Sequence, residues 1–96
     1  MTSRFETVHN YNDDAVFRLI IDTASLYPAF SSQPDLLADV ACVALNRLPP
    51  RYIRHEVDFS FYLTEHERLE IDNAIVEAVS YAFNFVQART ALRSRK

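Results

Sequence analysis

Apolar residues recur at helical spacing in two segments of the first half of the chain. The first segment follows Asn12, a residue type that caps helices, and ends before Pro28. The second begins at Ser32, which an acidic residue follows three positions later, has Pro34 in its first turn, and ends at Pro49. The apolar positions are Val16, Phe17, Leu19, Ile20, Ile21 and Ala24 in the first helix and Leu37, Val40, Ala41, Ala44 and Leu48 in the second.

A third helix is predicted from Glu65 to about Arg93, with a capping box formed by Thr64 and Glu67 at its start. Arginines near its end suit the negative pole of the helix dipole. Its main apolar stripe consists of Ile71, Ile75, Ala78, Val79, Ala82 and Val86, and Val76, Tyr81, Phe83 and Phe85 lie outside that stripe. An apolar surface this broad on a long helix predicts a second packing partner, and we expect a homodimer.

Between the second and third helices the hydrophobic period changes to two. Apolar and polar residues alternate from Ile53 to Leu63, a pattern typical of a half-buried strand. The chain holds no second strand pattern of similar quality. The segment therefore either lies as an extended arm over the helices or pairs with its copy in another subunit, and we favour an arm that packs on a dimer partner. The expected fold is mainly α, with three main helices and one extended or short β segment at about residues 52–62.

Composition narrows the classes of protein to consider. The 96 residues are predicted to form one domain, residues 1–96. Glycine is absent, which excludes phosphate-binding loops, dinucleotide fingerprints and nucleophile elbows because each requires it. The net charge of −3 at pH 7 argues against general affinity for nucleic acid or anionic lipid. A single cysteine, no signal-peptide pattern and no apolar run of bilayer length predict a cytoplasmic protein without membrane association.

A basic corner interrupts this acidic chain at residues 44–55, ALNRLPPRYIRH. Arg47, Arg51 and Arg54 flank two successive prolines, and Tyr52 adds an aromatic ring. Prolines fix the backbone, so cationic donors beside them lose little entropy when an anion binds. The alternative is that the arginines are solvated and pair at the surface with Asp39, Glu56 or Asp58.

The segment DVACVALNRLPPRYI, residues 39–53, resembles the central motif of the ComFB family, the late competence development proteins. The family pattern is an aspartate, an Ala-Leu-rich turn and then Asn-Arg/Lys-Leu-Pro-Pro-Arg/Lys-Tyr, which falls here on Asp39 and residues 44–52. The lead-in VHNYNDDAVFRLI resembles the family's first helix, and IDNAIVEAVSYAF resembles its C-terminal helix. The resemblance covers most of the chain, and its specific part is the central motif.

The resemblance implies a small, mainly helical, dimeric cytoplasmic protein. The family is associated with binding cyclic di-GMP and, in some members, cyclic di-AMP, as a receptor rather than an enzyme. Many members carry zinc-binding cysteines ahead of the aspartate, but residues 31–38, SSQPDLLA, contain none, so no metal is expected. We therefore expect a non-enzymatic receptor that needs no cofactor, favours cyclic di-GMP, can accept cyclic di-AMP and signals to an unknown downstream protein.

A cyclic dinucleotide has two phosphates and two flat bases, so its site needs cationic donors, planar groups for stacking and partners for base edges. The arginines and Tyr52 offer the first two, and Asn46 and Asp39 are candidates for reading a base edge. The predicted ligand-binding residues are Asp39, Asn46, Arg47, Pro50, Arg51, Tyr52, Arg54 and Tyr62. The alternatives are that Asn46 caps its helix, that Asp39 is a buried partner of Arg51 and that the tyrosines are core aromatics.

No arrangement of residues points to catalysis or to a metal. The histidines are scattered, Cys42 lies on the apolar side of its predicted helix, and the glutamates that open the last helix indicate a solvated helix start. The second hypothesis for function is a ligand-free dimerisation or adaptor protein. Its working surface would be the apolar excess on the last helix and the extended segment.

Overall fold

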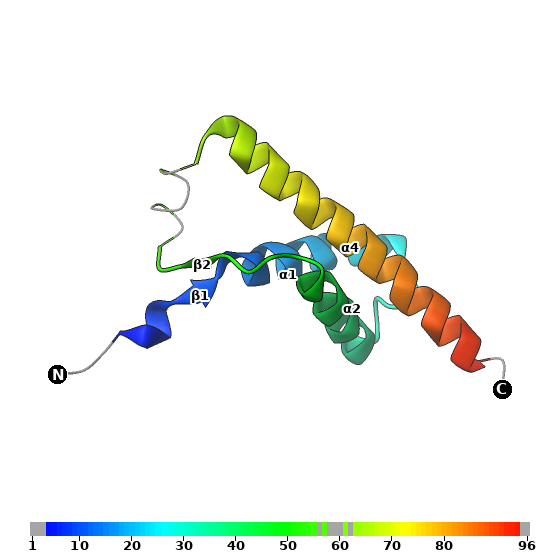
Figure 1. The fold of residues 1–96 in the computed structure, drawn as a ribbon. Helices are drawn as coiled ribbons and strands as arrows, with labels where there is room; N and C mark the ends of the chain where they lie inside the picture. The colour runs from blue at the N-terminus through cyan, green and yellow to red at the C-terminus, as the bar shows by residue number, and fades with distance from the viewer. Residues whose placement is uncertain (1–3, 56, 58–60, 62, 95–96) are drawn as a thin grey trace.

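Three long helices make up most of the structure, a computed structural model that describes residues 4–55, 57, 61 and 63–94. Helix α1 spans Tyr11–Thr23, α2 spans Pro34–Asn46 and α4 spans Glu65–Ser94 (Figure 1). Short 3-10 turns precede and follow α1, η1 at Phe5–Thr7 and η2 at Ala24–Leu26. The predicted fold class, mainly α with three main helices and a long C-terminal one, is confirmed.

The core forms where α4 lies across α1 and α2 (Figure 1). All six residues of the predicted stripe on α4 are buried, which confirms that assignment. The other helices contribute shorter stripes at helical spacing, as expected for amphipathic helices that share one core. The buried residues that face α4 from these helices are Val16 and Ile20 on α1 and Val40, Ala41 and Ala44 on α2.

Phe83 extends the core beyond the predicted stripe. The side chain is fully buried, with its ring centroid 4.5 Å from that of Tyr27 and 5.9 Å from that of Phe30. Both partners lie in the connection between α1 and α2, so this connection covers a side of α4 that the two helices leave open. By contrast, Val76, Tyr81 and Phe85 are exposed, in agreement with their positions outside the stripe.

A short antiparallel strand pair joins the two ends of the first half of the chain. Strand β1, His9–Asn10, pairs with β2, Tyr52–Ile53, with Asn10 opposite Tyr52 and His9 opposite Ile53. The prediction that the extended segment lacks a partner within the chain is therefore wrong for residues 52–53. The strand is also shorter than the alternation suggested, because Val57 and Phe61 have helical backbone. Residues 56, 58–60 and 62, which the predicted segment included, lie outside the described residues.

The helix starts match the prediction in one case out of three. Thr64 and Glu67 form the predicted capping box of α4: the Glu67 amide donates to Thr64 Oγ1 at 3.1 Å, and the Thr64 amide donates to Glu67 Oε1 at 3.3 Å. Helix α1 is capped by Asn10 rather than by Asn12, since the Asn12 amide donates to Asn10 Oδ1. The N-cap of α2 is Gln33, without a side-chain cap bond, so the predicted role of Ser32 is wrong.

Candidate functional site

Hydrogen bonds from the start of α1 hold the backbone of the basic corner on both sides of the double proline. On one side, Asn12 Nδ2 donates to the Pro49 carbonyl at 2.9 Å. On the other, the Arg51 amide donates to Asn10 Oδ1 at 2.9 Å, and the Tyr11 amide donates to the Arg51 carbonyl at 2.7 Å. Asn12 is only 2% exposed. The corner is thus fastened to α1 by contacts that leave the side chains of its arginines free for other partners.

Arg47 follows the last residue of α2 and lies against α4. It is the C-cap of the helix, and its guanidinium carbon is 3.7 Å from the centroid of the Tyr81 ring. This is a cation–π contact between two exposed side chains. Asn46, the last residue of α2, is exposed, so the C-cap that we considered for Asn46 belongs to Arg47.

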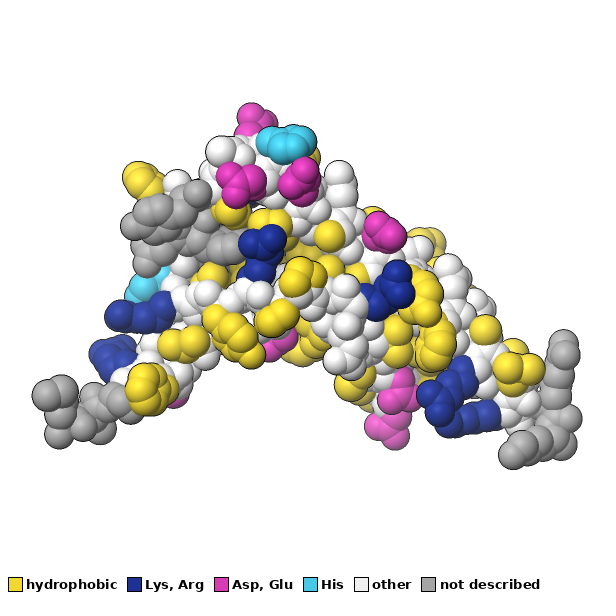
Figure 2. All heavy atoms as spheres, in the orientation of Figure 1, with side chains coloured by type: hydrophobic (Ala, Val, Ile, Leu, Met, Phe, Trp, Pro, Cys, Tyr) yellow, Lys and Arg dark blue, Asp and Glu magenta, His cyan; other side chains and the backbone are white. Residues whose placement is uncertain are grey.

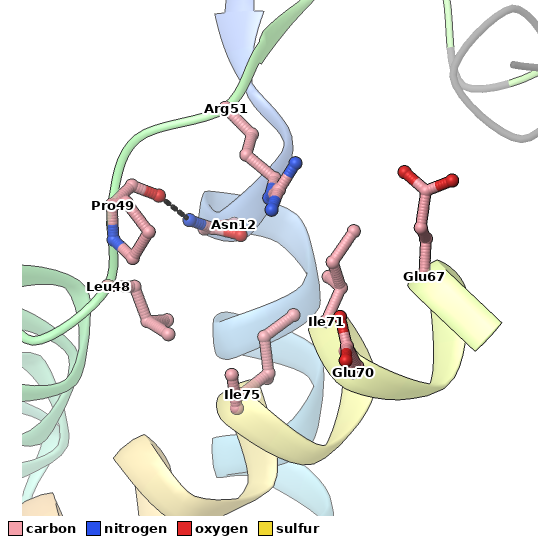
Figure 3. Close-up of a pocket in the computed structure, with 9 residues that line it drawn as sticks. Asn12, Leu48, Pro49, Arg51, Glu67, Glu70, Ile71 and Ile75 are labelled. Carbon is pink, nitrogen blue, oxygen red and sulfur yellow. Dashed lines mark hydrogen bonds between the residues drawn. The ribbon is translucent and has the colours of Figure 1, made fainter. Parts of the chain in front are cut away.

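Arg51 lines a pocket between the corner and the first turns of α4. Figure 3 shows its guanidinium on one side of the pocket and the carboxylates of Glu67 and Glu70 on the side formed by α4. Asn12, from α1, lies next to Pro49 on the same side of the pocket as Arg51. The remaining lining residues are Leu48, Pro49, Ile71, Ala74 and Ile75.

The rest of the corner faces solvent. Pro50, Tyr52 and Arg54 are all exposed, and Tyr52 keeps 69% of its surface accessible even though it belongs to β2. The alternative of a buried core aromatic is therefore wrong for Tyr52. Tyr62 lies outside the described residues.

Asp39 belongs to a different part of the surface. With Cys42 and Val43 of α2 it lines a groove whose other wall carries Arg89 and Arg93, from the end of α4. Asp39 is exposed, so the alternative of a buried partner for Arg51 is wrong. Cys42 is exposed as well, which corrects its predicted place on the apolar side of the helix.

The structure therefore distributes the predicted site residues over several environments. In Figure 2, the Lys and Arg side chains on the visible face form separate groups rather than one continuous patch. Within residues 4–55, 57, 61 and 63–94, no carboxylate forms an ion pair with Arg47, Arg51 or Arg54. Two of the acidic residues proposed as surface partners, Glu56 and Asp58, lie outside that range. The ligand-binding role of the set stays a prediction.

Glu67 and Glu70 are pocket residues that the sequence did not single out. The sequence indicates a solvated helix start for both, and each has a local partner there: Glu67 accepts from Thr64, and Glu70 Oε1 lies 3.0 Å from His66 Nε2. Their spacing of three residues places both side chains near one face of α4. This spacing is the signal in the sequence that the two glutamates can act at one site. Which face meets the corner depends on the tertiary packing.

Two kinds of feature are absent from the described residues. None of the helices in those residues combines the length and apolar character needed to cross a bilayer. No three His, Cys, Asp or Glu side chains in the same residues are grouped in a way that could hold a metal ion.

The fold and the corner together define a small helical domain in which an Asn-Arg-Leu-Pro-Pro-Arg-Tyr turn is fastened to the first helix and packed beside the last one. The family model described as late competence development protein ComFB matches residues 9–90, and the chain belongs to the ComFB family. No curated protein and no solved structure matches the chain.

Proposed function

We propose that this protein is a non-enzymatic receptor for a cyclic dinucleotide, with cyclic di-GMP favoured, and that it passes the binding event to a partner protein. Membership of the ComFB family supports this proposal. The observation that carries it is the basic corner itself. Its backbone is fixed by three hydrogen bonds to the first two residues of α1 and their N-cap, Asn10. Within the described residues, its three arginines have no carboxylate partner.

A fixed backbone favours binding because less conformational freedom is lost when the ligand arrives. Guanidinium groups suit phosphates since each offers several N–H donors in a planar fork, and charge-assisted bonds of this type are stronger than neutral ones. Tyr52, with most of its ring exposed, offers a surface on which a base can stack. The corner thus supplies the donors and the planar group that the ligand requires.

The Arg47–Tyr81 contact suggests how binding could reach a partner. A phosphate that engages the Arg47 guanidinium competes with the Tyr81 ring for the same cation. Tyr81 lies on the exposed side of α4 and stacks on Phe85, with ring centroids 5.9 Å apart. Ligand binding at the corner would therefore change an aromatic surface on α4.

Thermal melts against a panel of nucleotides test the proposal directly. A ligand that binds only the folded protein raises its stability by mass action, so we expect cyclic di-GMP to raise the melting temperature in a concentration-dependent way. Calorimetry then gives the affinity. Dissociation constants above roughly 100 μM for both cyclic di-GMP and cyclic di-AMP correspond to less than about 5.5 kcal/mol of binding free energy, and the receptor proposal would be abandoned.

The homodimer belongs to the same proposal and rests on a separate observation. Helix α4 carries large apolar side chains that the described part of the chain leaves exposed: Leu69, Val76, Tyr81, Phe85 and Leu92. At about 3.6 residues per turn, Tyr81, Phe85 and Leu92 fall near one face of the helix. A cluster of this kind is expected to be covered by a partner. Sedimentation velocity at several concentrations tests this, and a species of one chain mass at all of them would reject the dimer.

The exposed apolar side chains of α4 also favour the second candidate function, a ligand-free dimerisation or adaptor protein. The two candidates differ in the melts. An adaptor would form dimers yet show no shift with any nucleotide of the panel, whereas a receptor would show the shift.

A further inference from the structure

The pocket beside Arg51 is smaller than a site for a whole ligand. It holds about 160 Å³, below the roughly 300–1,000 Å³ of pockets that enclose drug-sized molecules. Its apolar lining, mainly Leu48, Ile71 and Ile75, suits the face of a flat ring (Figure 3). The pocket therefore has room for one ring system rather than for a complete dinucleotide.

Hydrogen-bond acceptors with unused capacity lie on the α4 side of this pocket. Glu67 Oε1 accepts from Thr64 and Glu70 Oε1 contacts His66, which leaves Oε2 of each carboxylate without a contact among the described residues. Ionised carboxylates only accept hydrogen bonds. The α4 wall thus favours a ligand edge that presents N–H donors.

Asn12 adds a third acceptor, and this one belongs to a buried side chain. Its Nδ2 is taken by the Pro49 carbonyl, and Figure 3 shows its Oδ1 turned the other way, toward the pocket. Within the described residues, Oδ1 accepts no hydrogen bond. The Asn12 side chain is 2% exposed, and every polar atom of it that is fully buried has a hydrogen-bond partner. Because Oδ1 has no partner, it is not fully buried, and the pocket is the side from which it is reached.

Donors come from the wall opposite α4. The guanidinium of Arg51 lines the pocket and forms no ion pair within the described residues. One wall therefore carries the planar guanidinium of Arg51, a hydrogen-bond donor, and the opposite wall carries the carboxylate acceptors of Glu67 and Glu70. The surface between them is apolar. A ring that fits must carry acceptors on one edge and donors on another.

We infer that this pocket is a guanine subsite, in which Arg51 donates to O6 and N7 of the base and Glu70 accepts from N1–H and the N2 amino group. The inference rests on the proposed function, because it names the base of the ligand and the residues that read it. Arg with O6 and N7 of guanine is the commonest specific protein–base contact. The carboxylate of Glu70 matches the Watson–Crick donors of the same base.

Adenine does not fit the same arrangement. Its N6 amino group would point donors at the Arg51 guanidinium, and its N1, an acceptor, would face a carboxylate. Each mismatch leaves a polar group of the pocket without a partner, and such unpaired groups are the main source of discrimination between similar ligands. The pocket therefore selects guanine by rejecting adenine on both walls.

This assignment changes two roles predicted from the sequence. Asp39, considered for the base edge, lines the groove beside Arg89 and Arg93 rather than this pocket. Arg51 contacts the base, so Arg47 and Arg54 are left to bind the phosphates. Glu67 is a weaker reader than Glu70 because its Oε1 is needed to cap α4.

Calorimetry on the full chain with cyclic di-GMP and cyclic di-AMP tests the inference. We expect cyclic di-GMP to bind at least about tenfold more tightly, and Glu70→Gln to remove most of that preference, since one bidentate base contact carries about this discrimination. Glu70 is exposed and outside the core, so the variant should fold. An unchanged ratio of the two affinities in Glu70→Gln, or a preference for cyclic di-AMP in the unmodified protein, overturns the inference.

Two control variants distinguish a role of Glu70 in the pocket from its role in the ion pair with His66 at the start of α4. His66→Gln removes this ion pair, as Glu70→Gln does, but leaves the Glu70 carboxylate in place. Glu77→Gln removes an exposed carboxylate of α4 that does not line the pocket. Both should keep the preference for cyclic di-GMP. If His66→Gln abolishes the preference as fully as Glu70→Gln does, the ion pair rather than the pocket is responsible and the inference fails.

GMP and AMP distinguish failure of the inference from failure of the proposed function. If neither cyclic dinucleotide binds, the receptor proposal falls. A preference for GMP over AMP that Glu70→Gln removes would still support the guanine subsite. No difference between GMP and AMP in that case would overturn the subsite as well.

Discussion

Arg47 and Tyr81, which are far apart in the sequence, form a cation–π contact in which the guanidinium carbon lies 3.7 Å from the ring centroid. The contact joins the end of α2 to the middle of α4. Because both side chains are exposed, the interaction is expected to stabilise the fold by about 0.5–1 kcal/mol. A double-mutant cycle with Arg47→Met and Tyr81→Leu, followed by urea unfolding, should give a coupling energy of about this size.

Tyr81→Phe is the matched control for this cycle, since it keeps the ring and removes only the hydroxyl. It should retain most of the coupling with Arg47. A coupling energy of zero for the leucine variant would show that the two side chains contribute nothing to each other. Any change in ligand response would then need another explanation.

Replacing Asn12 should loosen the basic corner. Asn12→Ala removes the hydrogen bond to the Pro49 carbonyl from a side chain that is 2% exposed, so the free energy of unfolding should fall by about 1–3 kcal/mol. Asn12→Asp keeps the shape but cannot donate from its side chain when ionised, so it should be destabilising too. Urea unfolding measures both, and Asn73→Ala on the exposed face of α4 should change stability by about 0.5 kcal/mol or less.

Two phenylalanines of α4 should differ sharply in their contribution to stability. Phe83→Ala empties the site between Tyr27 and Phe30 and should reduce the free energy of unfolding by about 3–5 kcal/mol. Domains of ordinary stability have only about 5–15 kcal/mol in total, so this variant is expected to be marginally folded. Phe85→Ala, at a position 42% exposed, should reduce the free energy of unfolding of a single chain by about 1 kcal/mol or less. Equal losses at the two positions would contradict the assigned core.

Arg51→Ala should weaken binding of cyclic di-GMP by about tenfold or more, because a charge-assisted contact to the ligand is lost. The fold should persist, since the structural bonds of Arg51 use its backbone amide and carbonyl rather than its side chain. Calorimetry gives the affinity and circular dichroism verifies the helix content. Arg18→Ala, an exposed arginine on α1 outside the pocket, is the control, and an affinity of Arg51→Ala equal to that of the control removes Arg51 from the site.

The helices and the stripe on α4 could be predicted because they depend on local periodicity and on proline. The errors occur where tertiary contacts decide. Asn10 and Asn12 both precede the acidic first turn of α1, and either residue type can cap a helix. The structure assigns the cap to Asn10, whose Oδ1 accepts from the Asn12 amide and, across the sequence, from the Arg51 amide. Strand β1 has two residues and no detectable period, so its pairing with β2 could not be predicted.

The candidate site could be predicted in part for the same reason. The arginines and prolines of the corner stand next to one another in the sequence, so their proximity in space needs no tertiary information. Glu70 and Asn12 come from other helices, and they reach the pocket only through the way α1 and α4 pack around the corner. Asp39 is close to the corner in sequence, but its helix turns it toward the end of α4.

Helix α4 meets the basic corner near its first turns and continues past α1 and α2 to the C-terminal end of the molecule (Figure 1). Thirty residues at 1.5 Å per residue make it about 45 Å long. A rigid rod of that length converts a tilt of about 5° at one end into a displacement of about 4 Å at the other. The buried stripe from Ile71 to Val86 lies between the pocket and Arg89 and Arg93, so such a tilt requires the core to repack. A ligand that drives this repacking would carry the end of α4 to a position that another molecule can detect.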